Sequence, residues 1–152
     1  SPTDQTVPRI AFVFPGQGSQ YVGMLKDVVA QIPAAAAKLQ EIDETLKRMG
    51  YPSFAEIAWN DQGKLGTDVW LTQLSVLLSD VIMYAAVTSL GVHPDVICGH
   101  SYGEFPALVA AGSLNLEQAI LATRARADAI RTGCTTPGPV PSTHLTLPKI
   151  SR

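Results

Sequence analysis

Two short apolar runs stand out along the chain, and glycine lies in or beside the turn that follows each of them. The first run, residues 9–14, is rich in strand-forming residues and stops at Pro15-Gly16. The second run, residues 96–99, follows a turn at residues 93–95. Both predict buried strands, because runs this short and bounded by turn residues are typical of strands. Since a long helical region separates them, the sequence predicts an α/β fold with a parallel sheet flanked by helices.

Apolar residues recur at helical spacing through most of the remaining sequence up to residue 131. In residues 68–90 they occupy i, i+3, i+4 and i+7, the pattern of a helix that packs into a core. Pro33 is expected to break the helical region that begins near Gly23. Asn115, followed three residues later by Gln118, resembles a capping box. The predicted helices span residues 23–49 with that break, 54–59, 68–90, 104–111 and 115–131.

The character of the chain changes after Thr132. Four of the eleven prolines fall in this last segment, and neither helical nor alternating periodicity remains there. We therefore expect a folded domain over residues 9–131 and an irregular tail over residues 132–152.

Composition and charge narrow the possible functional classes. Hydrophobic residues make up 46% of the chain and charged residues 16%, which fits a domain that buries a core on both faces of its sheet. A formal charge of -2 gives no electrostatic case for nucleic acid. No apolar run reaches the roughly 20 residues of a membrane span, and residues 1–9 lack the apolar core of a signal peptide. We therefore expect no nucleic acid, no membrane and a cytoplasmic location.

The two cysteines indicate neither a disulfide framework nor a metal site. Cys98 lies inside an apolar run and Cys134 in a Pro/Gly-rich stretch. Cys98 is expected to be a small core residue, and no metal is expected.

The pentapeptide Gly99-His100-Ser101-Tyr102-Gly103 carries the clearest chemical signal. It matches the G-x-S-x-G nucleophile elbow and lies between a predicted strand and a predicted helix, where that motif belongs. The glycines are needed because neighbouring side chains would collide in the strained turn. The hydroxyl of Ser101 would face the N-terminus of the next helix, where the N–H of Tyr102 is the nearest donor for an oxyanion.

A serine nucleophile needs a base, and the chain has three histidines. His100 adjoins the serine and should point away from its hydroxyl, whereas His93 precedes the strand. Neither geometry suits a general base. His144 lies in the irregular tail, and we interpret it as a loop histidine. The sequence therefore predicts a nucleophile whose base is missing.

Several motifs follow one another along the chain. They are Phe12-Val-Phe-Pro-Gly-Gln-Gly-Ser-Gln20 with Gly23-Met24, Thr72-Gln73, Gly99-His-Ser-Tyr-Gly-Glu104, Ala107-Leu-Val109 and Ala111-Gly112. Together they resemble one family, the acyltransferase domains of fatty acid and polyketide synthases, of the malonyl-CoA:acyl carrier protein transacylase type. The variant at residues 99–108, with residues 122–130, most resembles iterative polyketide synthases, including those of the enediyne type. The loop at residues 15–20 follows a strand's C-terminal end, where open α/β sheets bind ligands.

The resemblance implies a ping-pong mechanism in which Ser101 carries the acyl group as an ester. Malonyl-CoA or a related acyl-CoA would be the donor, and the phosphopantetheine thiol of an acyl carrier protein the acceptor, with no bound cofactor. Backbone N–H groups of Gln17 and Tyr102 would hold the oxyanion, and Arg126 would pair with the malonyl carboxylate. His100 and Gln73 would shape the site. Other domains of a synthase are possible partners.

The resemblance covers about half of such a domain, so the fold is expected to be a hydrolase-like large subdomain, incomplete at its C-terminal side. In the family, the catalytic histidine lies on a later segment than this chain contains. The mismatch after Thr132 suggests truncation or a shifted reading frame. We expect a partial acyltransferase domain over residues 9–131, with an exposed sheet edge, poor solubility and little activity alone.

Two other functions remain open from the sequence. The elbow alone is shared with serine esterases and lipases of the α/β-hydrolase type, although a hydrolase has no need for Arg126. A non-catalytic remnant that retains acyl-CoA or carrier-protein contacts is the third reading. Arg126 itself has a plain alternative, which is a solvated helix face shared with Arg124, Asp128 and Arg131.

Overall fold

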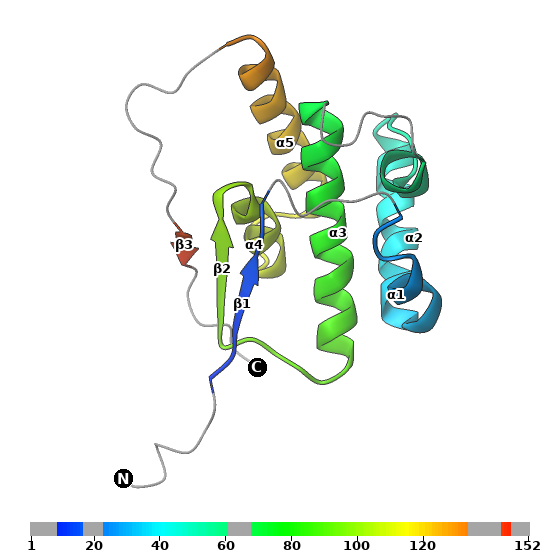
Figure 1. The fold of residues 1–152 in the computed structure, drawn as a ribbon, viewed down its shortest axis with the longest axis vertical. Coiled ribbons are helices and arrows are strands. Elements are labelled where there is room, and N and C mark those ends of the chain that lie inside the picture. The colour runs from blue at the N-terminus through cyan, green and yellow to red at the C-terminus, as the bar shows by residue number, and fades with distance from the viewer. Residues whose placement is uncertain (1–8, 17–22, 61–67, 134–143, 147–152) are drawn as a thin grey trace, which may run out of the picture.

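A computed structural model describes residues 9–16, 23–60, 68–133 and 144–146. Strand β1 (Ala11–Phe14) pairs in parallel with β2 (Val96–His100), and Ala11 lies opposite Val96 (Figure 1). The three-residue strand β3 (His144–Thr146) pairs antiparallel with β2, which gives the order β1-β2-β3. The two predicted strands and their parallel pairing are confirmed.

The prediction that the tail is irregular is wrong at β3. A strand of three residues is too short to show an alternating pattern in the sequence. Its pairing uses backbone groups, which every residue except proline can supply. For this reason the side-chain pattern of the tail carried no sign of it.

The helices occur where the sequence predicts them. Pro33 is the first residue of its helix, where a missing N–H is harmless, and Ile32 before it is extended, so the helical region breaks at this point. At the last helix, the side chains and backbones of Asn115 and Gln118 form both hydrogen bonds of a capping box. The helices are α1 (Lys26–Gln31), α2 (Pro33–Arg48), the π-helical turn η2 (Ala55–Trp59), α3 (Val69–Ser89), the 3-10 turn η3 (Ser101–Gly103), α4 (Glu104–Ala110) and α5 (Leu116–Arg131).

Helix α3 lies at the centre of the fold and contacts α2, α4, α5, η2 and η3 (Figure 1). Most of its side chains are buried, although Met83 is 42% exposed. Asp68 caps its N-terminus by accepting a hydrogen bond from the N–H of Leu71. Among the described helices, it alone is long and apolar enough to span a membrane by length and composition. Since most of it is buried inside the protein, its apolar surface is that of a core helix.

The described helices cover one face of the sheet. Phe14 and Ile97 pack with Ala107 of α4, and Phe12 and Tyr84 border the same small cluster. The other face is open, because Ala11 is exposed, Val13 is 61% exposed, and Val96 and Cys98 are only half-buried. The prediction of a core on both faces is therefore wrong for the residues described.

The physical reason is that most apolar side chains are buried between helices. The larger core cluster is built from buried side chains of α2, η2, α3, η3 and α5, and partly buried residues of α1 and α4 pack against it. It includes no residue of β1 or β2. The high hydrophobic fraction thus reflects helix packing around α3 instead of a second layer on the sheet.

Candidate active site

Ser101 lies at a sharp turn between β2 and α4, as the elbow motif predicts. Strand β2 ends at His100, and Ser101 opens the short turn η3 that leads into Glu104. Ser101 has a φ of 54°, the left-handed region that L-residues other than glycine rarely adopt. The residue is also exposed. A strained, solvent-accessible serine between strand and helix has the geometry of a nucleophile elbow.

The two motif glycines are required by close backbone approach. A Cβ placed on Gly99 would lie 2.5 Å from the Cα of Glu104 and 2.5 Å from the carbonyl oxygen of Gly103. A Cβ on Gly103 would lie 2.0 Å from the carbonyl oxygen of Phe14. Both distances are far inside van der Waals contact with backbone atoms. The elbow therefore packs directly against the end of β1.

Gly16, two residues after the end of β1, packs against the turn that carries Ser101. A Cβ on Gly16 would lie 3.1 Å from the carbonyl oxygen of His100 and 3.3 Å from the amide nitrogen of Tyr102. Gly16 therefore borders the backbone on both sides of Ser101. Gln17, the other predicted oxyanion donor, lies outside the described residues.

Hydrogen bonds with η2 fix the backbone of Gly23 and Met24. The indole Nε1–H of Trp59 donates to the carbonyl of Met24 at 2.7 Å, and the N–H of Gly23 donates to the carbonyl of Ala58 at 3.2 Å. The Lys26 ammonium lies 5.6 Å from the centre of the Trp59 ring. With Gly16 packed on the elbow, the backbone on both sides of residues 17–22 is held in place.

Tyr102 joins the elbow to helix α5. Its ring is buried, and its hydroxyl is hydrogen-bonded to that of Thr123. Since the Thr123 hydroxyl donates to the carbonyl of Ala119, Tyr102 is the donor in the first bond. Burial raises the pKa of Tyr102 well above its usual value, while Thr123 and Arg126 act in the opposite direction and Asp80 adds to the rise. The phenol therefore stays neutral and can donate this bond.

Arg126 faces the elbow from α5. Its guanidinium carbon lies 5.6 Å from the centre of the Tyr102 ring and 6.0 Å from that of Phe105. Its neighbours Arg124 and Arg131 instead pair with the carboxylate of Asp128. The solvated helix face considered from the sequence thus holds Arg124 and Arg131, and the Arg126 guanidinium lies next to the residue that follows the nucleophile.

The two residues expected to shape the site occupy different environments. His100 is the exposed last residue of β2. Gln73 is 2% exposed on α3, and its Oε1 has no hydrogen-bond partner among the described residues. Helix α3 contacts the turn η3, so Gln73 belongs to an element that supports the elbow. Among the described residues, no group of three or more His, Cys, Asp or Glu side chains is placed to hold a metal ion.

Asp80 is a half-buried acid with one buried carboxyl oxygen, and the motif-based interpretation of the sequence missed it. Its Oδ2 is buried without a hydrogen-bond partner among the described residues, and burial raises the pKa of its carboxyl to about 8. One signal was available, because Asp80 is the only charged residue in the sequence of α3.

The raised pKa of Asp80 predicts a pH-dependent stability. Below about pH 4 the carboxyl is neutral in both folded and unfolded states, so it imposes no penalty. As pH rises from about 4 to 8, ionisation favours the unfolded state, and the free energy of unfolding should fall by up to several kcal/mol. In Asp80→Asn this fall should disappear. Urea unfolding at pH 5, 7 and 9 tests it, with Asp27→Asn, an exposed acid in α1, as control. Equal pH profiles for wild type and Asp80→Asn would contradict the burial of an unpaired carboxyl.

A strand that leads into a strained, exposed serine and then a helix defines an α/β protein of the nucleophile-elbow class. Within that class, the chain belongs to the acyl transferase domain family, whose model matches residues 11–145. This match extends past residue 131, where the sequence suggested a boundary. The family resemblance and the fold class inferred from the sequence are both confirmed.

Curated relatives and solved structures agree with this family. The chain is 36% identical over 120 residues to the malonyl CoA-acyl carrier protein transacylase of Bacillus subtilis, covering 79% of this chain and 37% of that protein. It is 33% identical to a non-reducing polyketide synthase of Arthroderma benhamiae, over 88% of this chain and 7% of that protein.

The structure superposes on the malonyl CoA-acyl carrier protein transacylase from Coxiella burnetii with a TM-score of 0.71 and 34% identity, covering 81% of this chain and 38% of that one. A malonyl-transacylase solved in complex with a type II polyketide synthase acyl carrier protein gives the same TM-score at 30% identity, over 82% and 40%. The chain thus spans well under half the length of these relatives.

Proposed function

We propose that this chain carries the nucleophile half of a malonyl-CoA:acyl carrier protein acyltransferase, with Ser101 as the acyl-carrying residue. The observation that supports this most is the pairing of a positive-φ serine with the Arg126 guanidinium over the adjacent Tyr102 ring. An esterase needs the serine but not a cation beside it. A transferase that selects a free carboxylate needs both.

In the first half-reaction, Ser101 Oγ attacks the thioester carbonyl of malonyl-CoA. The carbonyl oxygen becomes an oxyanion, which the N–H groups of Tyr102 and Gln17 would stabilise. Gly16 supports this assignment, because it precedes Gln17 in the sequence and lies close to the amide nitrogen of Tyr102. A base takes the serine proton during the attack. Collapse of the intermediate breaks the C–S bond and leaves malonyl-Ser101, and the base passes that proton to the departing thiolate, so coenzyme A is released as the thiol.

In the second half-reaction, the phosphopantetheine thiol of an acyl carrier protein attacks the ester and restores Ser101. The donor, the acceptor protein and further synthase domains are proposed partners, as is a cytoplasmic location. The relatives named above support the carrier protein, because one is solved with its carrier protein bound. The base is proposed to be the family histidine of a longer chain, so acylation by this chain alone should be slow and turnover slight.

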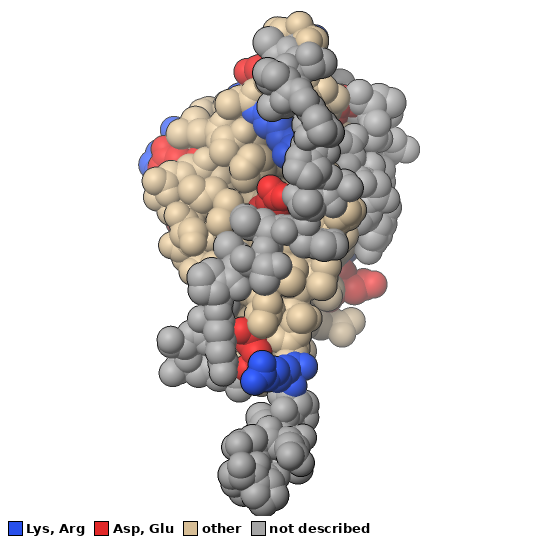
Figure 2. Space-filling view, turned by 90° about the vertical axis from the view of Figure 1, so that its left-hand side faces the viewer, with Lys and Arg blue, Asp and Glu red and all other residues tan. Residues whose placement is uncertain are grey.

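Replacing Ser101 by alanine tests the covalent intermediate. Intact-protein mass spectrometry after incubation with malonyl-CoA should show a single malonyl adduct on wild type and none on Ser101→Ala, because the oxygen that bears the ester is gone. Figure 2 shows no gathering of basic side chains on the described part of one face that would trap coenzyme A nonspecifically.

Matched controls separate the competing functions. Ser113→Ala, at a serine outside the elbow, should retain the adduct. If wild type instead hydrolyses p-nitrophenyl acetate in a Ser101-dependent manner and forms no malonyl adduct, the chain is a hydrolase. If folded wild type forms no covalent species with either reagent, the chain is a non-catalytic remnant.

A further inference from the structure

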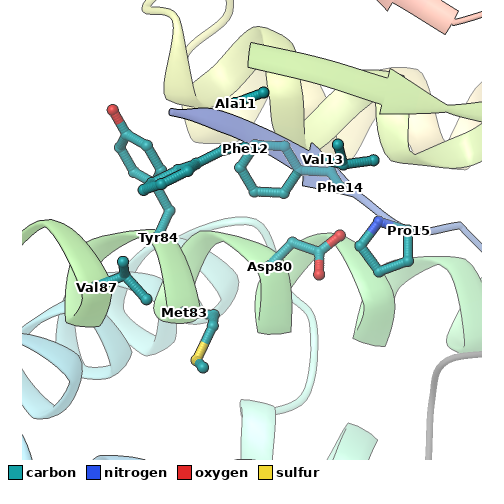
Figure 3. Close-up of a pocket in the computed structure, with 9 residues that line it drawn as sticks. All are labelled: Ala11, Phe12, Val13, Phe14, Pro15, Asp80, Met83, Tyr84 and Val87. Atoms are coloured by element: carbon teal, nitrogen blue, oxygen red, sulfur yellow. The ribbon is translucent and has the colours of Figure 1, made fainter. Parts of the chain in front are cut away.

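A cavity of about 270 Å³ lies beside strand β1. Its lining comes from two elements, β1 with Pro15 and one flank of α3 (Figure 3). The lining residues include Phe12 and Phe14 of β1 and Asp80, Tyr84 and Val87 of α3. It therefore runs between the strand and the central helix.

The carboxyl of Asp80 extends from α3 toward the end of β1, near Phe14 and Pro15 (Figure 3). Its Oδ2 is buried and has no hydrogen-bond partner among the described residues. The titratable side chains that influence this region are Tyr84 on α3, which lines the cavity, and Tyr102 in the elbow, which interacts electrostatically with Asp80. Both are acids, so neither neutralises the carboxylate. A buried carboxylate left in this state is unfavourable until a donor reaches it.

Aromatic rings form part of the wall, together with aliphatic side chains and Met83. Phe12 meets Tyr84 edge to face with ring centres 5.9 Å apart, and Phe14 lies 6.2 Å from Tyr84 at a tilt of 46°. Ring faces attract cations, and a guanidinium more than an ammonium, because it is planar and more weakly hydrated. A cavity that combines an unpaired carboxylate with aromatic walls matches the chemistry of an arginine side chain.

The edge of β1 beside this cavity is open. Strand β1 pairs with β2 along one side, and no described strand pairs with its other side. An open edge presents N–H and C=O groups that an added strand can satisfy. Val13, 61% exposed, provides an apolar contact for such a strand. The backbone groups and the cavity therefore lie where a single extended segment can use both.

We propose that this groove is a docking site for an extended peptide segment that pairs with the free edge of β1 and places an arginine side chain on Asp80. The strand supplies main-chain hydrogen bonds, and the arginine supplies the charge that the buried carboxylate lacks. The proposal does not rest on the proposed acyl transfer at Ser101. Its specificity comes from charge complementarity, because an uncharged side chain of the same shape leaves Asp80 unpaired.

Binding of two matched peptides tests the proposal. The probe is acetyl-Thr-Val-Arg-Val-Thr-amide, and its control carries citrulline, a neutral isostere, in place of arginine. At pH 8.5, above the pKa of Asp80 and below those of Tyr84 and Tyr102, the carboxylate is mainly ionised. Titration followed by ¹⁵N amide shifts should show the arginine peptide binding at least tenfold more tightly, with shifts confined to β1 and residues 80–87.

The Asp80→Asn variant completes the test, since asparagine keeps the shape and removes the charge. It should bind both peptides equally and weakly. The proposal is overturned if wild type does not distinguish the two peptides, if neither binds at millimolar concentration, if the shifts fall away from β1, or if Asp80→Asn still prefers arginine. None of these outcomes depends on whether the chain acylates Ser101.

Discussion

Gly103→Ala should destabilise the protein by about 3 kcal/mol or more. The new Cβ would lie 2.0 Å from the carbonyl oxygen of Phe14 and 2.8 Å from its carbonyl carbon, and these are backbone atoms that a rotamer change cannot move. Relief requires β1 and the elbow to separate, which disrupts the contacts that Phe14 makes with Ile97 and Ala107. Urea unfolding followed by circular dichroism measures the effect.

Gly112→Ala is the matched control for this change. Gly112 has a φ of 79°, but a Cβ there would meet no heavy atom within 4 Å. Its substitution should cost only about 1–2 kcal/mol, the price of a left-handed backbone for an L-residue. If the two variants lose equal stability, the close approach of the elbow to β1 is not what excludes a side chain at position 103.

Arg126→Ala should lower the rate of acylation by malonyl-CoA about 10- to 100-fold while leaving acylation by acetyl-CoA unchanged. This prediction rests on the proposed function. A charge-assisted hydrogen bond between guanidinium and carboxylate contributes about 1.5–3 kcal/mol, and acetyl-CoA has no carboxylate to use it. Time-resolved mass spectrometry of the Ser101 adduct with each donor gives both rates.

Arg124→Ala is the natural comparison, because Arg124 lies on the same helix but contacts Trp70 and Asp128 instead of the elbow. It should leave the preference for malonyl over acetyl groups intact. Tyr102→Phe should also retain it, since the ring beneath Arg126 remains, whereas Tyr102→Leu removes that ring. Equal loss of both acylation rates in Arg126→Ala would indicate a structural role for Arg126 and count against carboxylate selection.

Features set by local chemistry could be predicted from the sequence. A proline inside a helical region interrupts it, as Pro33 does here. Asn115 and Gln118, three residues apart, form a capping box. The elbow belongs with these features, because the need for glycine at positions 99 and 103 is a property of the turn itself. The two strands were predicted from their short apolar runs, and their parallel pairing from the helical region between them.

Features set by distant parts of the chain could not be predicted in the same way. The composition shows how many apolar residues the chain has but not which surfaces they cover. Most of them pack between α3 and the other helices, and one face of the sheet is left open among the described residues. Asp80 is the only charged residue of α3, and only the packing of β1 against α3 reveals that one of its carboxyl oxygens is buried. The bond between Tyr102 and Thr123 joins residues 21 positions apart, and no local pattern signals it.

Burial of most of α3 has a consequence for how the protein is made. The helix ends at Ser89, but its contacts with α4 and α5 are complete only after Arg131 has left the ribosome. At roughly 5–20 residues per second, an apolar segment as long as a membrane span stays uncovered for several seconds during synthesis. Production of this protein in cells should therefore depend on chaperones that shield nascent chains, even when the finished fold is stable.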